Sequence, residues 1–168
     1  MNAAFEKLMQ HMDERNVHYL TNAEKRSIWA DFRGEVGNYR ILALIETDDS
    51  MFQVIGGAPI RVPEGARPAV AETIARANFG LKAGKFEMDV DNGDVRFQVS
   101  QLLTSEGLED EVIGRLMGLT MSMLDLYLPA VLSVIYGNEL PKDAIRCVEA
   151  GFVGPGESSQ GDGPTPGG

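Results

Sequence analysis

Residues 78–99 read NFGLKAGKFEMDVDNGDVRFQV, and this stretch decides the fold. Apolar residues alternate with polar ones on both sides of the dipeptide Asn92-Gly93. Such alternation is typical of strands with one buried face, and Asn-Gly between two alternating runs is a strong hairpin signal. The stretch therefore predicts a two-stranded ribbon with one apolar face. That face consists of Phe86, Met88, Val90, Val95, Phe97 and Val99.

Placing Asn92 and Gly93 at the centre of a type I′ turn sets the register of the two strands. In that register, each apolar residue of one strand lies opposite an apolar residue of the other. The expected pairs are Val90 with Val95, Met88 with Phe97, and Phe86 with Val99. Asp89 then lies opposite Arg96 on the other face, an opposite-charge pair suited to a solvated surface.

The rest of the chain is divided by the same two periodicities, helical spacing and strict alternation. Helices are expected over 3–15, 64–81, 108–138 and 140–150. Three further strands are expected over 28–32, 39–46 and 51–55, and the Gly- and Pro-containing residues 56–63 are expected to form a connection. The predicted fold is α+β: a five-stranded antiparallel sheet in the order helix-β-β-β-helix-β-β-long helix.

The strand at 39–46 is apolar on both faces, because Leu42 and Leu44 point away from Ile41 and Ile45. A sheet that is covered on one side only should carry polar residues on the other. Two explanations remain open. Other parts of the chain cover the second face, or another chain does.

The long helix carries one charge, Asp125, between residues 116 and 136. Its length would suffice to span a bilayer, but an acid at its centre and Pro129 disfavour that interpretation. A helix that is apolar most of the way round is more often buried from two sides, by its own sheet and by a partner subunit. Met117 and Met121 fit either a core or an adaptable binding surface.

Acidic residues outnumber basic ones by 25 − 15 = 10, and the sequence pI is about 4.6. This charge argues against nucleic acid or an anionic membrane as the main partner. Cys147 is the single cysteine, so no disulfide forms within the chain, and we expect a cytoplasmic protein. Residues 1–150 are expected to form one domain and residues 151–168 a flexible tail rich in Gly, Pro and Ser.

The sequence contains no catalytic constellation, and we expect neither an enzyme nor a cofactor. His11, Glu14 and His18 match no metal-binding motif and are interpreted as surface residues. Asp125 is the only acid in an apolar setting. We expect it to cap a helix or to pair with Arg115, Lys142 or Arg146.

Two segments, AETIARANFGLKAGKFEMDVDNGDVRFQVS at 71–100 and LDLYLPAVLSVIYG at 124–137, resemble the YbjN-type family of bacterial sensory transduction regulators. The resemblance covers residues 5–138. It implies a fold similar to that of type III secretion chaperones, which are small acidic homodimers that bind extended stretches of a client protein. It supplies no catalytic residues.

These observations together predict a non-enzymatic, protein-binding domain with a chaperone-like or regulatory role, acting as a homodimer. The binding or dimer surface is expected to include Leu42, Leu44, Met117 and Met121. The alternative is a small-molecule sensor whose ligand lies between the long helix and the sheet, near Asp125 and Tyr127.

Overall fold

The computed structural model describes residues 2–151, and except for Gly151 the predicted tail lies outside the described residues. The chain begins with α1 (Ala3–Glu14) and continues through four strands to a short 3-10 helix (Glu64–Ala66). These strands are β1 (Leu20–Asn22), β2 (Ser27–Arg33), β3 (Asn38–Ile45) and β4 (Met51–Arg61). The second half comprises α2 (Arg67–Gly80), β5 (Lys85–Met88), β6 (Asp94–Leu102), α3 (Asp110–Tyr136) and α4 (Pro141–Ala150).

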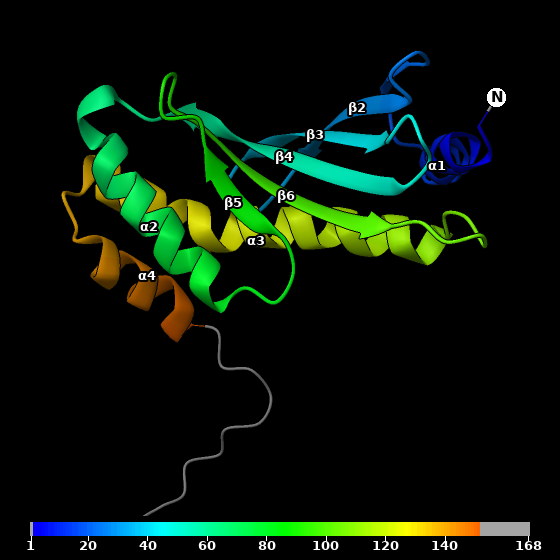
Figure 1. The fold of residues 1–168 in the computed structure, drawn as a ribbon. Helices are drawn as coiled ribbons and strands as arrows, with labels where there is room; N and C mark the ends of the chain where they lie inside the picture. Colours follow the sequence, from blue (N-terminus) through cyan, green and yellow to red (C-terminus); the bar gives the residue numbers. More distant parts are fainter. Residues whose placement is uncertain (1, 152–168) are drawn as a thin grey trace, which may run out of the picture.

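The strands form one antiparallel sheet in the order β1-β2-β3-β4-β6-β5 (Figure 1). The prediction of an α+β fold with an antiparallel sheet and a long helix is confirmed. The predicted number of strands, five, was wrong, because the sheet has six. The sixth strand, β1, pairs Leu20 with Trp29 and Asn22 with Ser27. It has only three residues and no alternation of buried and exposed side chains, so it leaves no periodic signal in the sequence.

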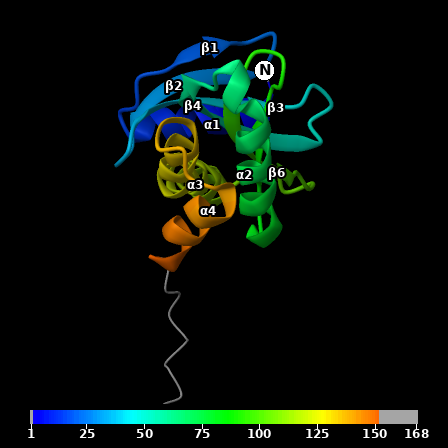
Figure 2. The same cartoon turned by 90° about the vertical axis from the view of Figure 1, so that its left-hand side faces the viewer.

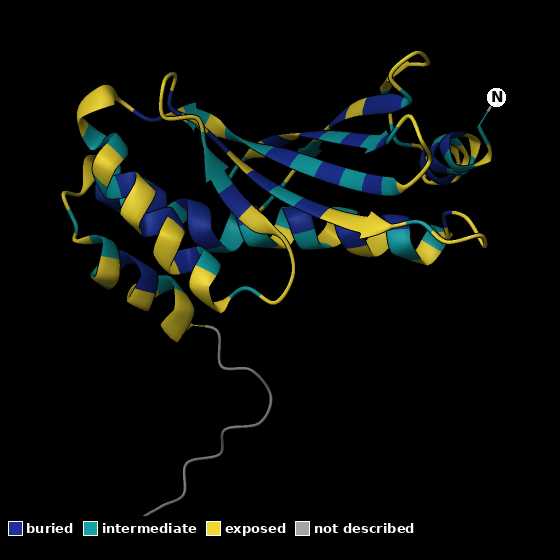
Figure 3. Ribbon diagram, viewed as in Figure 1, coloured by how far each residue is buried: buried dark blue, intermediate teal, exposed yellow. Residues whose placement is uncertain are grey.

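The helices pack on one side of the sheet, which we call the inner face (Figures 1 and 2). Among residues 2–151, the opposite, outer face is bordered by a helix only at its hairpin end, where Ala71 and Ile74 of α2 line a hollow together with residues of that face. Buried and half-buried residues alternate along β3 and β4, as Figure 3 shows. The inner face carries the largest fully buried side chains of the sheet, which are Tyr39, Phe52, Phe97, Ile28, Ile41, Ile45 and Val54.

Contact between α3 and β4 depends on Gly56. A Cβ added at Gly56 would lie 2.6 Å from the side chain of Thr120 and 2.7 Å from that of Leu124. The missing side chain therefore lets the helix lie directly on the sheet. Residues 56–61 were predicted to be a connection, but they continue β4 to Arg61, and the register shifts between Gly57 and Arg61.

The long helix α3 packs against the ribbon of β5 and β6, as predicted. The rings of Phe86 and Tyr127 meet edge to face, with centroids 5.4 Å apart. Within the described residues α3 is the single helix that could cross a membrane by length and composition. Its buried residues, among them Ile113, Leu124 and Leu128, contribute to the core that the helices and sheet share.

The hairpin register differs from the prediction by two residues. Phe86 pairs with Phe97 and Met88 with Val95, so the ion pair of Arg96 is made with Glu87 (Nε to Oε2, 2.6 Å) and not with Asp89. Because side chains alternate with a period of two, a shift of two keeps every residue on its predicted face. The one consequence for the apolar set is that Val90 moves into the loop, where it is 62% exposed.

The longer loop is stabilised by its own polar groups. The Gly93 amide donates to the Asp89 carbonyl (2.7 Å), and the Asp94 amide donates to the Asn92 side chain (2.8 Å). Gly93 has φ +83°, but Asn92 does not take the positive φ that a type I′ turn requires. The Val62 amide also donates to the Gly93 carbonyl (2.8 Å), which holds the loop against the end of β4.

The edge strand β5 is closed by the side chain of Asn78. The Phe86 amide donates to Asn78 Oδ1 (2.8 Å), and Asn78 Nδ2 donates to the Phe86 carbonyl (3.0 Å). The amide group thereby takes the place of a neighbouring strand residue. It occupies backbone groups that an edge strand would otherwise expose.

We expect Gly93→Ala to lower the free energy of unfolding more than Gly107→Ala. Both glycines have positive φ, so each substitution costs about 1–2 kcal/mol of backbone strain. At Gly93 the added Cβ would also collide with the Val62 carbonyl oxygen, whereas nothing lies within 4 Å of the position at Gly107. Urea unfolding of both variants measures the difference. Equal losses would contradict the tight docking of the hairpin loop.

Candidate functional site

The outer face carries a row of apolar side chains that crosses four strands. Leu20 lies opposite Trp29, Trp29 opposite Leu42, and Leu42 opposite Ile55. Leu20 is 75% exposed and Trp29 42%, while Leu42 and Ile55 are half-buried. We call these four residues the apolar row. Such a continuous apolar strip on an uncovered sheet face is typical of a binding surface.

A second row, next to the first, has charged residues at both ends and a glycine, without a side chain, in the middle. Its order across the sheet is Asp31, Arg40, Gly57, Arg96 and Glu87. Arg40 binds Asp31 through two hydrogen bonds of 2.8 and 3.0 Å, and Arg96 binds Glu87. Both guanidinium groups are thus engaged by acids on the side away from Gly57. The glycine between them leaves a dip in the sheet surface.

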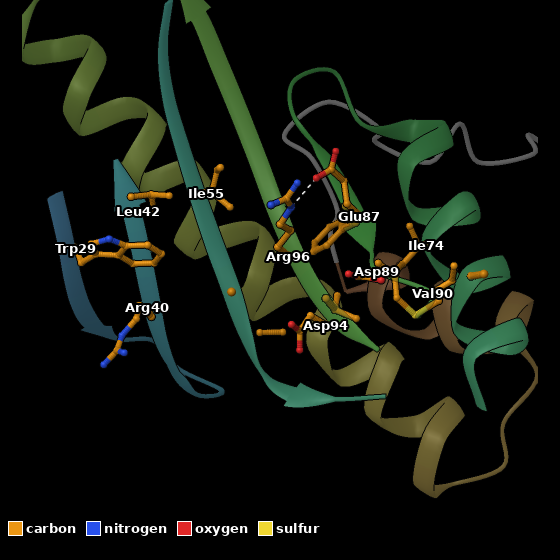
Figure 4. Close-up of a pocket in the computed structure, with 16 residues that line it drawn as sticks. Trp29, Arg40, Leu42, Ile55, Ile74, Glu87, Asp89, Val90, Asp94 and Arg96 are labelled. Carbon is orange, nitrogen blue, oxygen red and sulfur yellow. Dashed lines mark hydrogen bonds and ion pairs between the residues drawn. The ribbon is translucent and has the colours of Figure 1, made fainter. Parts of the chain in front are cut away.

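The two rows border a groove of about 830 Å³ (Figure 4). It runs from Trp29 and Leu42 across the sheet to Ile74 of α2 and Val90 of the hairpin loop. The loop end is held in place by Arg67, whose Nη1 donates to the carbonyls of Val90 (3.1 Å) and Asp91 (2.9 Å). The groove is therefore largely preformed.

The four residues predicted for a binding or dimer surface lie on two different surfaces. Leu42 lines the groove, and Leu44 lies on the same outer face, opposite Ser27 and Gln53. Met117 and Met121 are half-buried on α3, on the other side of the sheet. No single partner surface includes all four.

Asp125 anchors the turn between β2 and β3. Its carboxylate accepts hydrogen bonds from the amides of Glu35 and Val36 (both 3.0 Å) and from the hydroxyl of Tyr39 (2.6 Å). Burial raises the pKa of Asp125, but these three hydrogen bonds outweigh it and hold the pKa below its usual value. The predicted pairing with a basic residue was wrong. Of the three candidates, Arg115 binds Glu111 and Arg146 lies 3.6 Å from Asp143.

The side chain of Tyr127 points away from Asp125, toward Glu149 of α4. Its hydroxyl donates to Glu149 Oε1 (2.9 Å), and burial together with that acid raises the pKa of Tyr127 to about 12. Tyr127 lines a hollow of about 520 Å³, while Asp125 lines a different one of about 460 Å³. The structure therefore does not bring Asp125 and Tyr127 together in one ligand pocket.

His11 was interpreted as a surface residue, but it is buried. Its Nδ1 lies 2.6 Å from Asp110 Oδ1, and Arg15 Nη2 lies 2.8 Å from Asp110 Oδ2. These contacts, first that of His11 and then that of Arg15, lower the pKa of Asp110. The cluster joins α1 to the first turn of α3. Residues 2–151 contain no group of three or more His, Cys, Asp or Glu placed to hold a metal ion.

Sequence reasoning missed Trp29, Ile55 and Arg40 as groove residues. A signal for Trp29 was present, because it alternates with Ile28 and Ala30 and so belongs to the face that a one-sided sheet leaves to solvent. The dip at Gly57 and the pairing of Arg40 with Asp31 depend on strand register, which no local pattern in the sequence reveals.

The comparisons with known proteins agree on a family and a fold. Residues 5–133 match the family model YbjN, described as "Putative bacterial sensory transduction regulator". A solved structure, "Crystal structure of YbjN, a putative transcription regulator from E. coli", has a similar fold with a TM-score of 0.54. The match covers 81% of this chain and 93% of that one at 14% sequence identity. No curated protein matches the chain.

We expect Asp125→Asn to destabilise the protein at pH 7 by about 1.5–3 kcal/mol, the range for hydrogen bonds to a charged group. Because the pKa of Asp125 is lowered in the folded state, its stabilisation is present above about pH 4 and is lost as the pH falls through the folded-state pKa. The gap between wild type and variant should therefore narrow in acid. Urea unfolding at pH 7 and in acid measures it, with Glu106→Gln at an exposed site as control. A gap independent of pH would contradict the assignment.

Proposed function

The family model YbjN matches most of the chain, so the protein belongs to the YbjN family. We propose that it is a non-enzymatic regulator that binds another protein. The partner segment lies in the groove on the outer face. The observation that carries this proposal is the apolar row, which remains uncovered although it crosses four strands.

The geometry suits an extended segment. Leu42 and Ile55 offer apolar contacts, and the dip at Gly57 leaves room for a chain to cross the sheet. The charged side chains that flank the dip are already neutralised by each other, so a segment does not have to displace a free charge. Type III secretion chaperones, whose fold the family resemblance implies, bind extended clients on apolar surface, and we propose the same mode for this protein.

We further propose that the protein acts as a homodimer in the cytoplasm, and that two copies meet along α3. Met117 and Met121 flank the exposed Gly114 and Gly118 on this helix, so a second helix can approach closely. This surface lies across the sheet from the groove, so dimerisation and partner binding use different residues.

We expect two substitutions to separate the two activities. Leu42→Asp should weaken binding to the groove at least about tenfold, equivalent to about 1.4 kcal/mol, and leave the dimer intact. Met121→Asp should reduce the mass to that of one chain and leave groove binding intact. Trp29, the only tryptophan, reports on the groove by its fluorescence, and light scattering at several concentrations reports the mass.

The probe for the groove is a soluble synthetic peptide in which leucine and valine alternate with serine. Circular dichroism of each variant checks that the fold is kept. Binding by Leu42→Asp at the wild-type level would contradict the groove as the site. A wild-type mass of one chain at all concentrations would contradict the homodimer.

The alternative function, sensing of a small molecule, is favoured by the hollow beside Tyr127. Its volume of about 520 Å³ is within the range of about 300–1,000 Å³ that is typical of ligand pockets. Leu119, Met123 and Leu126 of α3 make its wall apolar. A ligand there would contact the long helix on the side of the molecule opposite the groove.

In a thermal-shift screen of metabolites, a ligand of this hollow should raise the melting temperature. At a hundredfold excess over Kd the gain corresponds to about 2.7 kcal/mol. Met123→Trp, which fills the hollow, should abolish the shift, and Met9→Leu on α1 should preserve it. A shift that survives Met123→Trp would contradict this site.

A further inference from the structure

We propose that the segment bound in the groove is basic at one end, and that this end lies beside the hairpin loop while its apolar side chains extend toward Trp29. This inference deepens the proposed function and rests on it. It concerns the chemistry of the partner and its direction in the groove.

The dimensions of the groove set the length of the segment. From Trp29 on β2 to Glu87 on β5 the sheet order gives four strand spacings, which is about 19 Å at about 4.8 Å each. An extended chain advances about 3.3 Å per residue, so about six residues span the groove. The two ends of such a segment meet different surroundings.

Each arginine in or beside the groove already has a carboxylate or carbonyl partner. Arg40 binds Asp31, Arg96 binds Glu87, and Arg61 lies 3.2 Å from Asp94. Arg67, close to the loop, donates hydrogen bonds to the carbonyls of Val62, Val90 and Asp91. An anion on the partner would therefore have to share a guanidinium group with an acid or a carbonyl that already contacts it.

The carboxylates at the loop end differ in this respect. Asp89 and Asp91 are exposed, and within residues 2–151 neither takes part in an ion pair. Asp89 lines the groove, and its Oδ1 accepts a hydrogen bond from the Asp91 amide (2.9 Å). With a net charge of −10 on the whole chain, a cationic side chain on the partner is attracted here.

The loop is rigid enough to present these acids at fixed positions. The Gly93 carbonyl is bound by the Val62 amide, and Arg67 holds the carbonyls of Val90 and Asp91. Val90, on the same loop, gives the methylene stem of a lysine or arginine an apolar contact. Binding of the basic end therefore costs little conformational entropy of the loop.

Two synthetic peptides test the inference. They share an alternating leucine-serine core and end in two lysines or in two glutamates, and Trp29 fluorescence follows their binding to the full-length protein. We expect the lysine peptide to bind at least tenfold tighter at low salt, with a preference that shrinks as salt is added. The double variant D89N/D91N should lose most of this preference. E106Q/E109Q, which removes the same charge from exposed positions after β6, should keep it.

The direction is tested with a dansyl group that accepts energy from Trp29. A dansyl group at the apolar end should receive more energy than one beside the lysines. Equal or tighter binding of the glutamate peptide, or the reverse order of energy transfer, overturns the inference and leaves the groove as a binding site. If neither peptide changes the fluorescence of Trp29, the groove does not bind an extended segment. The proposed function then fails, and the inference fails with it.

Discussion

The close approach of α3 to β4 at Gly56 is the contact on which the rest of the structure depends. Thr120 and Leu124 occupy the space that a side chain would fill, so the long helix lies flat against the centre of the sheet. The apolar residues of β3, β4 and β6 that face it become the core. Once this large helix covers the inner face, the remaining helices pack around it, and the outer face is left to solvent or to a partner.

Local periodicity predicted the elements that alternate or repeat over many residues. The ribbon faces were correct although the register was not, because a two-residue shift preserves the side of every residue. The register itself depends on hydrogen bonds between the loop and Val62, about thirty positions away in the chain, which no pattern within the hairpin reveals. Gly56 looked like a break for a similar reason, since its role appears only when α3 packs against it.

In the candidate site, too, local patterns predicted some residues, whereas contacts between distant parts of the chain could not be predicted. Leu42 was predicted because a doubly apolar strand is visible in the sequence. The neighbours that turn it into a groove come from the order of the strands and their register. Asp125 was singled out as unusual, but its partners are two backbone amides of the β2–β3 turn and Tyr39 at the start of β3, roughly ninety residues earlier. Backbone donors leave no mark in a sequence.

The amide of Asn78 has a consequence for the behaviour of many copies together. Stacking of sheets edge to edge into long fibres requires two available edges on every molecule, one to receive and one to offer. On β5, the outward-facing backbone groups of Phe86 are already bound by the Asn78 side chain. If two molecules join through the opposite edge, β1, the resulting pair presents only β5 edges, where Asn78 competes with an incoming strand at Phe86. Polymerisation of this kind is therefore disfavoured beyond a pair of molecules.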